Sequence, residues 1–463
     1  MPDALALIAN AAGKLTREGL LVSGRGATAL PGLVALTLDP DYISAVSSGL
    51  THGVACVSGT NGKTTTSRML ADITRTAGWD PIHNRSGSNL DRGVAAALVA
   101  QTTWYAEPRG NFGLFEIDEA SLSRVVGRMK PRVVVVTNLF RDQMDRYFEL
   151  DALARKIGDA LAGLPAETVL VLNADDPLVA NLALRRDAKT IFFGVDDPTV
   201  GGAIPQAISD ATRCPRCKSP LSYKRVVLAH VGDWSCPNCG LARPARDVSA
   251  TKVVLGENGS EIELAGTVGS VFEPVRVPIP GLYNAYNALA ALAAARALDL
   301  GLAEGIRALA GFKAAFGRLE TIPYKGRTLR LVLVKNPAGF NAAIGALLET
   351  GRKPRLLAAL SDRDADGRDV SWIWDADFEA LAPSVEHAVI TGLRGRDLAL
   401  RFKYAGLGKE RIEVVDDWTG AIERAVALTS DGGELVLLAT YTAMQALRAL
   451  IARSGAVAPF WED

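Results

Sequence analysis

The sequence is short of the features that define several classes of protein. Its 51 Lys and Arg residues are balanced by 51 Asp and Glu residues, so it has no net charge with which to hold nucleic acid. We also find no strong local basic patch in the sequence. No uncharged apolar run approaches the roughly 18 residues that a transmembrane span requires. The first residues contain an acid, Asp3, and no cationic start, unlike a secretory signal. We therefore expect a cytoplasmic protein that neither binds nucleic acid nor crosses a membrane.

Cysteine is also scarce, and four of the five cysteines fall within one short segment, while Cys56 stands alone. In a cytoplasmic chain such clustering favours metal binding over disulfides. Each of the two pairs has two residues between its cysteines, and the distance between the pairs is typical of a zinc ribbon. Since thiolates fill all four ligand positions, we expect a structural Zn²⁺ site and not a catalytic one, formed by Cys214, Cys217, Cys236 and Cys239. The alternative, four free cysteines clustered by chance, explains the spacing less well.

Apolar residues are plentiful, at 48% of 463 residues, which predicts a folded enzyme of several domains. Near-continuous apolar strands alternate with helical patterns from residue 51 to about 200, which indicates a parallel sheet covered by helices on both faces. A segment richer in Gly, Pro and Cys interrupts the alternation, and a second α/β series begins after residue 316. We predict an α/β fold with a central ATP-binding domain (1–315), a zinc-ribbon insertion (about 205–245) and a Rossmann-like C-terminal domain (316–463).

The segment VSGTNGKTTT (57–66) has the pattern of a phosphate-binding loop. Its glycines permit a tight turn whose N–H groups face inward at the start of a helix. Lys63 would neutralise charge on the β- and γ-phosphates of ATP, and the hydroxyl of Thr64 or Thr65 would coordinate Mg²⁺. An ordinary strand-to-helix turn is the alternative, but it does not need Lys-Thr-Thr. We therefore predict an ATP site that includes Gly59, Thr60, Asn61, Gly62, Lys63, Thr64 and Thr65.

The strict phosphate-loop motif is not met, because Val57 occupies the position of its first glycine. GTNGKTT instead resembles the variant of the Mur ligases and folylpolyglutamate synthases. Further segments follow in the order of that family: FEID with Glu116, Thr137-Asn138, Asn173 to Asp176, Asn284 and Asn287 in YNAYN, and FGRLE from Phe316 to Glu320. The resemblance implies that Glu116 binds Mg²⁺, that the two YNAYN asparagines contact adenine, and that Arg318 offsets charge on the transferring phosphoryl group.

Each of these residues also has an ordinary structural interpretation. Glu116 would then be a surface acid at a strand end, Asn284 and Asn287 would be helix caps, and Arg318 would be a linker charge. The order of the motifs along the chain favours the functional interpretation.

Five segments are similar to one subfamily, MurT, the ligase subunits of the MurT/GatD lipid II isoglutaminyl synthases. They are NRSGSNLDRG (84–93), NLFRDQMDRY (138–147), the zinc ribbon, LVKNPAGFN (333–341) and SDRDADGRDVSWIWDADFE (361–379). The resemblance implies that ATP phosphorylates the α-carboxylate of the D-isoglutamyl residue of the peptidoglycan stem peptide, and that ammonia then gives D-isoglutamine. It also implies that Lys335 contacts the nucleotide.

The chain departs from typical Mur ligases in two ways. The phosphate loop starts only about sixty residues in, so we expect the uridine-nucleotide domain that usually precedes it to be missing. Gln143 stands where the typical ligase has a histidine that helps to hold a second Mg²⁺, so neither a second metal ion nor a carbamoylated lysine is assigned here.

The sequence shows no glutaminase of its own, since Cys56 lies in an apolar strand and only four histidines exist. We therefore expect free ammonia or a partner glutaminase of the GatD type to supply the nucleophile. The resemblance implies that Asp366, in the loop 362–367, completes a Cys-His-Asp triad with that partner, although Asp364 and Asp369 are alternatives. A calcium loop is excluded because Ile373, and not Glu, occupies its twelfth position.

Two other functions remain open from the sequence. One is a folylpolyglutamate-synthase-like or Mur-like ligase that adds an amino acid in place of ammonia. The other is a zinc-ribbon nucleic-acid or scaffold protein with a vestigial nucleotide fold, which the neutral charge and the intact Lys63-Thr64 oppose.

Overall fold

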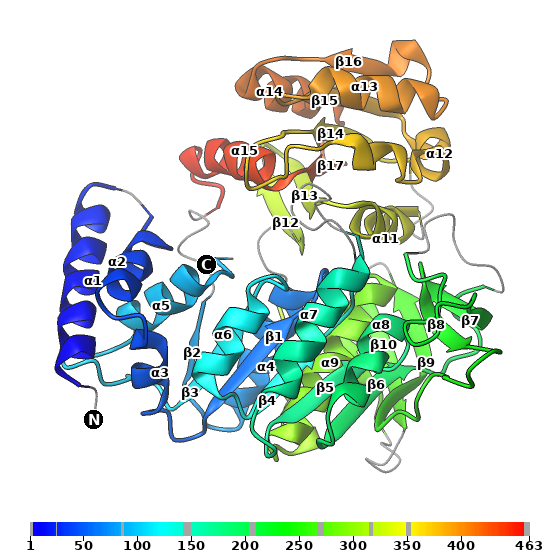
Figure 1. Cartoon of the computed structure of the whole chain (residues 1–463). Coiled ribbons are helices and arrows are strands. Elements are labelled where there is room, and N and C mark those ends of the chain that lie inside the picture. Colours follow the sequence, from blue (N-terminus) through cyan, green and yellow to red (C-terminus); the bar gives the residue numbers. More distant parts are fainter. Residues whose placement is uncertain are drawn as a thin grey trace.

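The structure is a computed structural model, and it describes residues 3–24, 26–84, 88–141, 150–202, 210–256, 258–265, 273–313, 318–348 and 353–457. The described residues form two bodies, each built on its own large sheet, with the smaller body above the larger one in Figure 1. The predicted α/β class is confirmed, since each body has a largely parallel sheet. The predicted boundary at residues 315 and 316 lies outside the described residues.

The larger sheet has nine strands in the order β11-β10-β9-β6-β5-β4-β1-β3-β2. The pairs from β2 to β9 are parallel, while β10 and β11 add an antiparallel edge. The strand bounds are β1 (Val54–Ser58), β2 (Pro81–His83), β3 (Phe112–Glu116), β4 (Val133–Val136), β5 (Val169–Asn173), β6 (Thr190–Val195), β9 (Val248–Gly256), β10 (Gly259–Ala265) and β11 (Val275–Val277).

Both faces of this sheet are covered, which explains why its strands are apolar without alternation. In β1, for example, Ala55 and Val57 join the core on one face, while Val54 and Cys56 join the core on the other. The first face carries α4 (Lys63–Thr76), α9 (Leu282–Ala297) and α10 (Leu302–Ala310). The second carries α1 (Ala4–Val22), α2 (Leu30–Leu38), α3 (Tyr42–Ser47), α5 (Asp91–Ala100), α6 (Leu122–Met129) and α7 (Leu150–Ala162).

The cysteine-rich segment forms a small antiparallel hairpin of β7 (Ser222–Leu228) and β8 (Val231–Ser235). It lies in the connection between β6 and β9, which are neighbours in the large sheet. A short helix, α8 (Pro177–Ala180), follows β5 close to it. The hairpin is therefore an addition to the sheet, at the right of the larger body in Figure 1.

The second sheet has six strands in the order β12-β13-β17-β14-β15-β16, all parallel except the β12–β13 pair. The bounds are β12 (Arg318–Tyr324), β13 (Arg327–Leu333), β14 (Arg355–Ala359), β15 (His387–Thr391), β16 (Ile412–Val414) and β17 (Glu434–Ala439). One face packs on α11 (Pro337–Leu348), α12 (Phe378–Leu381) and α13 (Gly395–Tyr404), and the other on α14 (Trp418–Leu428) and α15 (Tyr441–Arg453).

Candidate active site

The phosphate loop connects the end of β1 to the first residue of α4, Lys63, at the carboxyl edge of the large sheet. Gly59 and Gly62 have φ angles of 125° and 86°, in the region that favours glycine. A Cβ atom at Gly59 would lie 2.3 Å from Thr137 Oγ1, and one at Gly62 would lie 2.1 Å from Asn287 Oδ1. Close approach of neighbouring side chains, as well as backbone conformation, therefore requires both glycines.

Lys63 is buried and its ammonium group is held inside the loop. Nζ donates hydrogen bonds to the carbonyl oxygens of Gly59 and Thr60, and it lies 2.9 Å from Glu119 Oε2. The side chains of Lys63 and Glu119 are only 6% and 1% exposed. Since a buried ion pair is screened little by solvent, this contact fixes the lysine at the start of α4.

Glu116 ends β3 beside the phosphate loop, because its Cα pairs with that of Val57 on β1. Its position is set by Asn84, whose side-chain amide donates to the Glu116 carbonyl at 2.8 Å and accepts from the Glu116 amide at 2.9 Å. The residue is buried, with 4% of its surface exposed. Burial raises the pKa of Tyr441, at the start of α15, and the nearby carboxylates of Glu116 and Asp366 raise it further. Tyr441, in the smaller body, therefore lies near enough to Glu116 to be affected by the charge of its carboxylate.

Thr137 and Asn138 follow β4 and hold the phosphate loop from one side. Thr137 Oγ1 and Asn138 Nδ2 both donate to the Asn61 carbonyl, at 2.8 and 3.0 Å, and Asn138 Oδ1 accepts from the Asn61 amide at 2.8 Å. The Thr60 amide also donates to the Asn138 carbonyl. In turn, Asn173 at the end of β5 donates to the Thr137 carbonyl. The predicted segments Thr137-Asn138 and Asn173 to Asp176 thus support the loop.

Asn284 and Asn287 lie one turn apart near the start of α9, with Asn287 Nδ2 donating to Asn284 Oδ1 at 3.0 Å. Asn287 Oδ1 also accepts from Thr66 on α4. Neither asparagine is the N-cap of α9, since Gly281 has that position. The structure brings Asn287 to the phosphate loop and so rules out the simple cap interpretation.

A pocket lies between the phosphate loop and the smaller body. The residues that line it come from segments far apart in the sequence. They include Asn61, Gly62, Thr65, Thr137, Asn287 and Lys335. Asn336, next to Lys335, donates to Asn61 Oδ1 at 3.3 Å across the two bodies. The pocket therefore places groups from both bodies beside the phosphate loop. Thr64 is half-buried and does not line this pocket.

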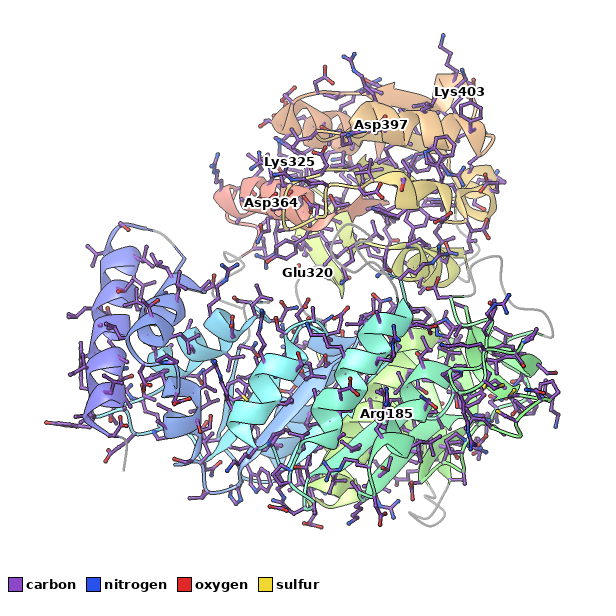
Figure 2. The ribbon with its side chains drawn as sticks, viewed as in Figure 1. Arg185, Glu320, Lys325, Asp364, Asp397 and Lys403 are labelled. Atoms are coloured by element: carbon purple, nitrogen blue, oxygen red, sulfur yellow. The ribbon has the colours of Figure 1, made fainter. Side chains whose placement is uncertain are left out.

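Some residues of the predicted site lie outside the part of the chain that the structure describes. The side chain of Arg318, Phe316 and Gln143 lie outside the described residues. Glu320, the last residue of the same FGRLE segment, pairs with Arg448 of α15, whose Nη2 lies 2.9 Å from Oε1. Figure 2 shows Glu320 on β12, on the side of the smaller body that faces the large sheet.

Asp366 is buried, whereas residues 363–365 before it in the loop are exposed. Only 3% of Asp366 is exposed, and its carboxylate accepts hydrogen bonds from the amide and hydroxyl of Thr442 on α15. Burial raises the pKa of Asp366, while the hydrogen bonds from Thr442 act in the opposite direction. Asp364 is instead exposed beside α15 in Figure 2 and pairs with Arg368. The role of Asp366 in a shared triad stays a prediction.

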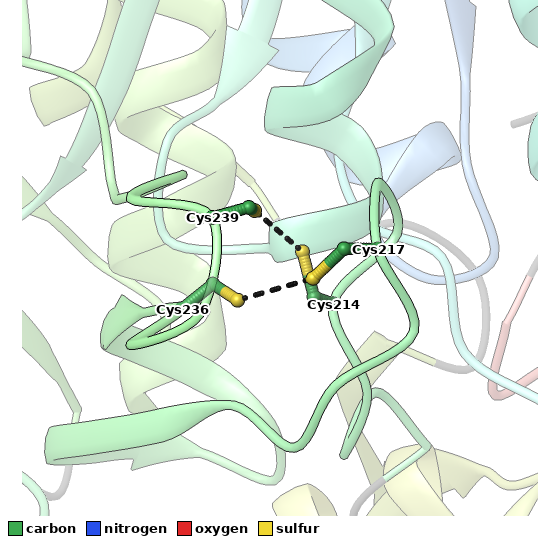
Figure 3. Close-up of side chains that lie close together, drawn as sticks. All are labelled: Cys214, Cys217, Cys236 and Cys239. Atoms are coloured by element: carbon green, nitrogen blue, oxygen red, sulfur yellow. Dashed lines mark hydrogen bonds between the residues drawn. The ribbon is translucent and has the colours of Figure 1, made fainter.

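The four clustered cysteines meet at one point, as Figure 3 shows. All four Sγ atoms lie within 4.8 Å of one another, and the Cys214–Cys239 and Cys217–Cys236 distances are 3.6 and 3.4 Å. A tetrahedral ion with Zn–S bonds of about 2.3 Å places its ligands about 3.8 Å apart. The cluster therefore fits a metal ion of this kind.

Sequence reasoning missed three residues that organise the site, namely Asn84, Glu119 and Asn336. Asn84 and Asn336 lie inside segments that resembled the family, but nothing in the sequence gives their contacts. Glu119 lies three residues after Glu116, and two acids so close together after a strand were the only signal for it. The fifth cysteine, Cys56, is fully buried on β1 with its Sγ 3.8 Å from Met129 Sδ, as expected of a core thiol.

Comparisons with known proteins identify this arrangement. A family model described as the Mur ligase middle domain matches residues 57–213, and one described as MurT ligase C-terminal matches residues 333–444. Two solved structures share the fold: a pseudomurein peptide ligase type C from Methanothermus fervidus (TM-score 0.62, 23% identity, 88% of this chain and 79% of that one) and Mycobacterium tuberculosis folylpolyglutamate synthase complexed with ADP (TM-score 0.64, 18% identity, 96% and 99%).

The fold and the site define a ligase of the Mur type. Two curated proteins named lipid II isoglutaminyl synthase (glutamine-hydrolyzing) subunit MurT align over almost their whole length. The one from Streptococcus pneumoniae R6 is 35% identical over 447 residues, and the one from Staphylococcus aureus COL is 32% identical over 452 residues; each alignment covers 95% of this chain and 96% of the relative. The chain therefore belongs to the MurT family, as its sequence predicted. No helix in the described part of the chain has the length and apolar character to span a membrane.

Proposed function

We propose that this protein is the ligase subunit of a lipid II isoglutaminyl synthase. It would amidate the α-carboxylate of the D-glutamate residue in the peptidoglycan stem peptide, using ATP and ammonia, to give D-isoglutamine. The observation that carries this proposal is an intact phosphate loop facing a pocket between two bodies, in a chain 35% identical to a MurT subunit.

A carboxylate is a poor electrophile, so the reaction needs a leaving group. ATP would transfer its γ-phosphoryl group to a carboxylate oxygen, which releases ADP and forms an acyl phosphate. Ammonia would then attack the acyl carbon and expel inorganic phosphate, and the nitrogen would lose a proton to leave the amide. The enzyme's contribution is to bind the charged reactants in line and to offset charge on the phosphoryl group.

Several groups around the phosphate loop would serve this task. Lys63 would contact the β- and γ-phosphates, and Glu116 with Thr64 would hold Mg²⁺. The adenine end would lie near Asn284 and Asn287. Arg318 and Lys335 would approach the phosphates from the smaller body.

The four-cysteine cluster would hold Zn²⁺ with a structural role. All four of its ligand positions would be occupied by thiolates from Cys214, Cys217, Cys236 and Cys239, which leaves none for water or substrate.

Ammonia would come from a GatD-type glutaminase subunit. Cys56 is fully buried in the sheet, and burial raises the pKa of its thiol, so it cannot serve as the nucleophile of a glutaminase. Asp366 lies in the loop 362–367, where it contacts α15, and it would orient the partner's histidine.

The test is amidation of purified lipid II by the complex of this chain with its glutaminase, measured by mass spectrometry. ATP-dependent formation of the amide from glutamine is expected, and Lys63→Ala should abolish it together with ATP turnover. Wild-type activity in the Lys63→Ala variant would contradict the phosphate-loop assignment. Addition of an amino acid in place of ammonia would contradict the proposed substrate and favour another Mur-type activity.

A further inference from the structure

The β7–β8 hairpin connects the cysteine cluster to the nucleotide pocket. At one end, β8 stops at Ser235, immediately before Cys236. At the other end, the two strands are joined by Ala229 and His230, and Leu228 pairs with Val231. The hairpin therefore has the four-cysteine cluster at one end and its two-residue turn at the other.

The tip of this hairpin forms part of the pocket wall. Leu228 and Val231 line the same pocket as Asn61, Gly62 and Asn287. Val231 is 2% exposed, and it belongs with Ala229 to the hydrophobic core that contains α4 and α9. Apolar side chains at this place would cover the face of a nucleobase whose phosphates lie on the loop.

Buried contacts tie the hairpin to the segment after β5. The Gly232 amide donates to the Asp175 carbonyl at 2.9 Å, and Trp234 Nε1 donates to the Ala174 carbonyl at 3.0 Å. His230 is fully buried, with Nε2 3.4 Å from Asp176 Oδ2. A Cβ atom at Gly232 would lie 2.2 Å from the Arg225 carbonyl oxygen, so the two strands can pair this closely only with glycine there.

The same segment positions a second wall of the pocket. Asp175 Oδ2 accepts from the hydroxyl of Tyr286 on α9 at 2.7 Å, and Tyr286 lines the pocket beside Asn287. Arg243, which follows the last cysteine, donates from Nε to Asp175 Oδ1 at 2.7 Å. The ribbon thus contacts the carboxylate that holds Tyr286.

We propose that the inserted hairpin is the wall that covers the nucleobase, through Leu228 and Val231, and that a metal ion on the four cysteines holds this wall in place. Nucleotide affinity then depends on Zn²⁺, although the cluster touches no phosphate. This inference rests on the proposed nucleotide site, and it assigns to the ribbon a role in binding the base in addition to its structural role.

The first experiment uses calorimetry on the full chain. It measures the binding of two ligands: a non-hydrolysable ATP analogue in the presence of Mg²⁺, and inorganic tripolyphosphate. Leu228→Ala removes apolar contact with the base, so the Kd for the ATP analogue should rise about tenfold, while the Kd for tripolyphosphate stays the same. Lys224→Ala is the matched control, since Lys224 is exposed on the same hairpin, and it should change neither value.

Equal Kd values for the ATP analogue in wild type and Leu228→Ala would overturn the inference but leave the proposed function intact. If wild type binds neither ligand, the proposed function itself fails. Zinc content and the melting temperature establish that the variant is folded.

The second experiment removes the metal from wild type with a chelator and then restores it. The ATP analogue should bind at least about tenfold more weakly to the metal-free chain, tripolyphosphate should bind as before, and added Zn²⁺ should reverse the loss. Unchanged affinity for the ATP analogue would overturn the proposal. If the metal-free chain lost affinity for both the ATP analogue and tripolyphosphate, the proposal would also be overturned, because the metal would then support the whole domain and not this wall alone.

Discussion

Lys63 and Glu119 form a buried ion pair with Nζ and Oε2 2.9 Å apart. Removing one partner of such a pair leaves the charge of the other buried and uncompensated. We therefore expect Glu119→Gln to lower the free energy of unfolding by about 3 kcal/mol. The double variant Lys63→Met/Glu119→Leu should recover most of that loss, because apolar side chains can replace a buried pair. Chemical denaturation would measure both. A Glu119→Gln variant as stable as wild type would show that the pair contributes nothing.

Gly62 offers a test of how closely the phosphate loop packs. In Gly62→Ala the new methyl group would lie 2.1 Å from Asn287 Oδ1, so the loop or the asparagine must move, and we expect at least about a hundredfold loss of nucleotide affinity. Gly78→Ala is the control, because Gly78 also has a positive φ of 82° but nothing lies within 4 Å of its Cβ position. The control should lose only about 1–2 kcal/mol of stability and no affinity. Similar affinities for the two variants would contradict the close-packing argument.

Asp366→Asn separates a role in the partner's triad from a role within this chain. An asparagine oxygen can still accept from the Thr442 amide, so the fold should persist. We expect glutamine-dependent activity of the complex to fall at least about a hundredfold while ammonia-dependent activity is retained. Asp364→Asn should affect neither, since Asp364 is exposed and pairs with Arg368 four residues further along the chain. Equal loss of both activities in Asp366→Asn would indicate a structural role alone.

Thiol reactivity should distinguish the cysteines. Titration of the native, zinc-loaded chain with an alkylating reagent should modify none of the five cysteines rapidly, because metal or burial protects each one. Chelation should expose four, and Cys56 should react only after denaturation. Mass spectrometry of the modified peptides would give the count. Rapid modification of Cys56 in the native protein would contradict its placement in the core, and reactive ribbon cysteines in a zinc-loaded sample would contradict metal ligation.

The sequence predicted those parts of the site that depend on local pattern. Gly59, Gly62 and Lys63 belong to one turn and one helix start, so their residue types reveal the loop directly. Glu116 and Thr137 follow apolar strands, and the carboxyl ends of parallel strands meet at one sheet edge. The zinc cluster could also be predicted from the sequence, since a single hairpin is enough to bring together two cysteine pairs with fixed spacing.

Contacts between distant segments could not be predicted in this way. Asn336 reaches Asn61 only because two separate bodies meet, and no periodicity in either segment records that meeting. The burial of Asp366 depends on Thr442 of α15 and is invisible in an acidic loop sequence. The hairpin tip likewise enters the pocket because β7 and β8 pack on the segment after β5, which the cysteine spacing alone does not imply.

The Asn336–Asn61 hydrogen bond has a mechanical consequence. A hinge movement of the smaller body away from the large sheet would break this hydrogen bond to the phosphate loop, and so would couple opening of the site to release of a nucleotide held on that loop. Turnover in such a ligase would be paced by that hinge movement when the chemical steps are fast.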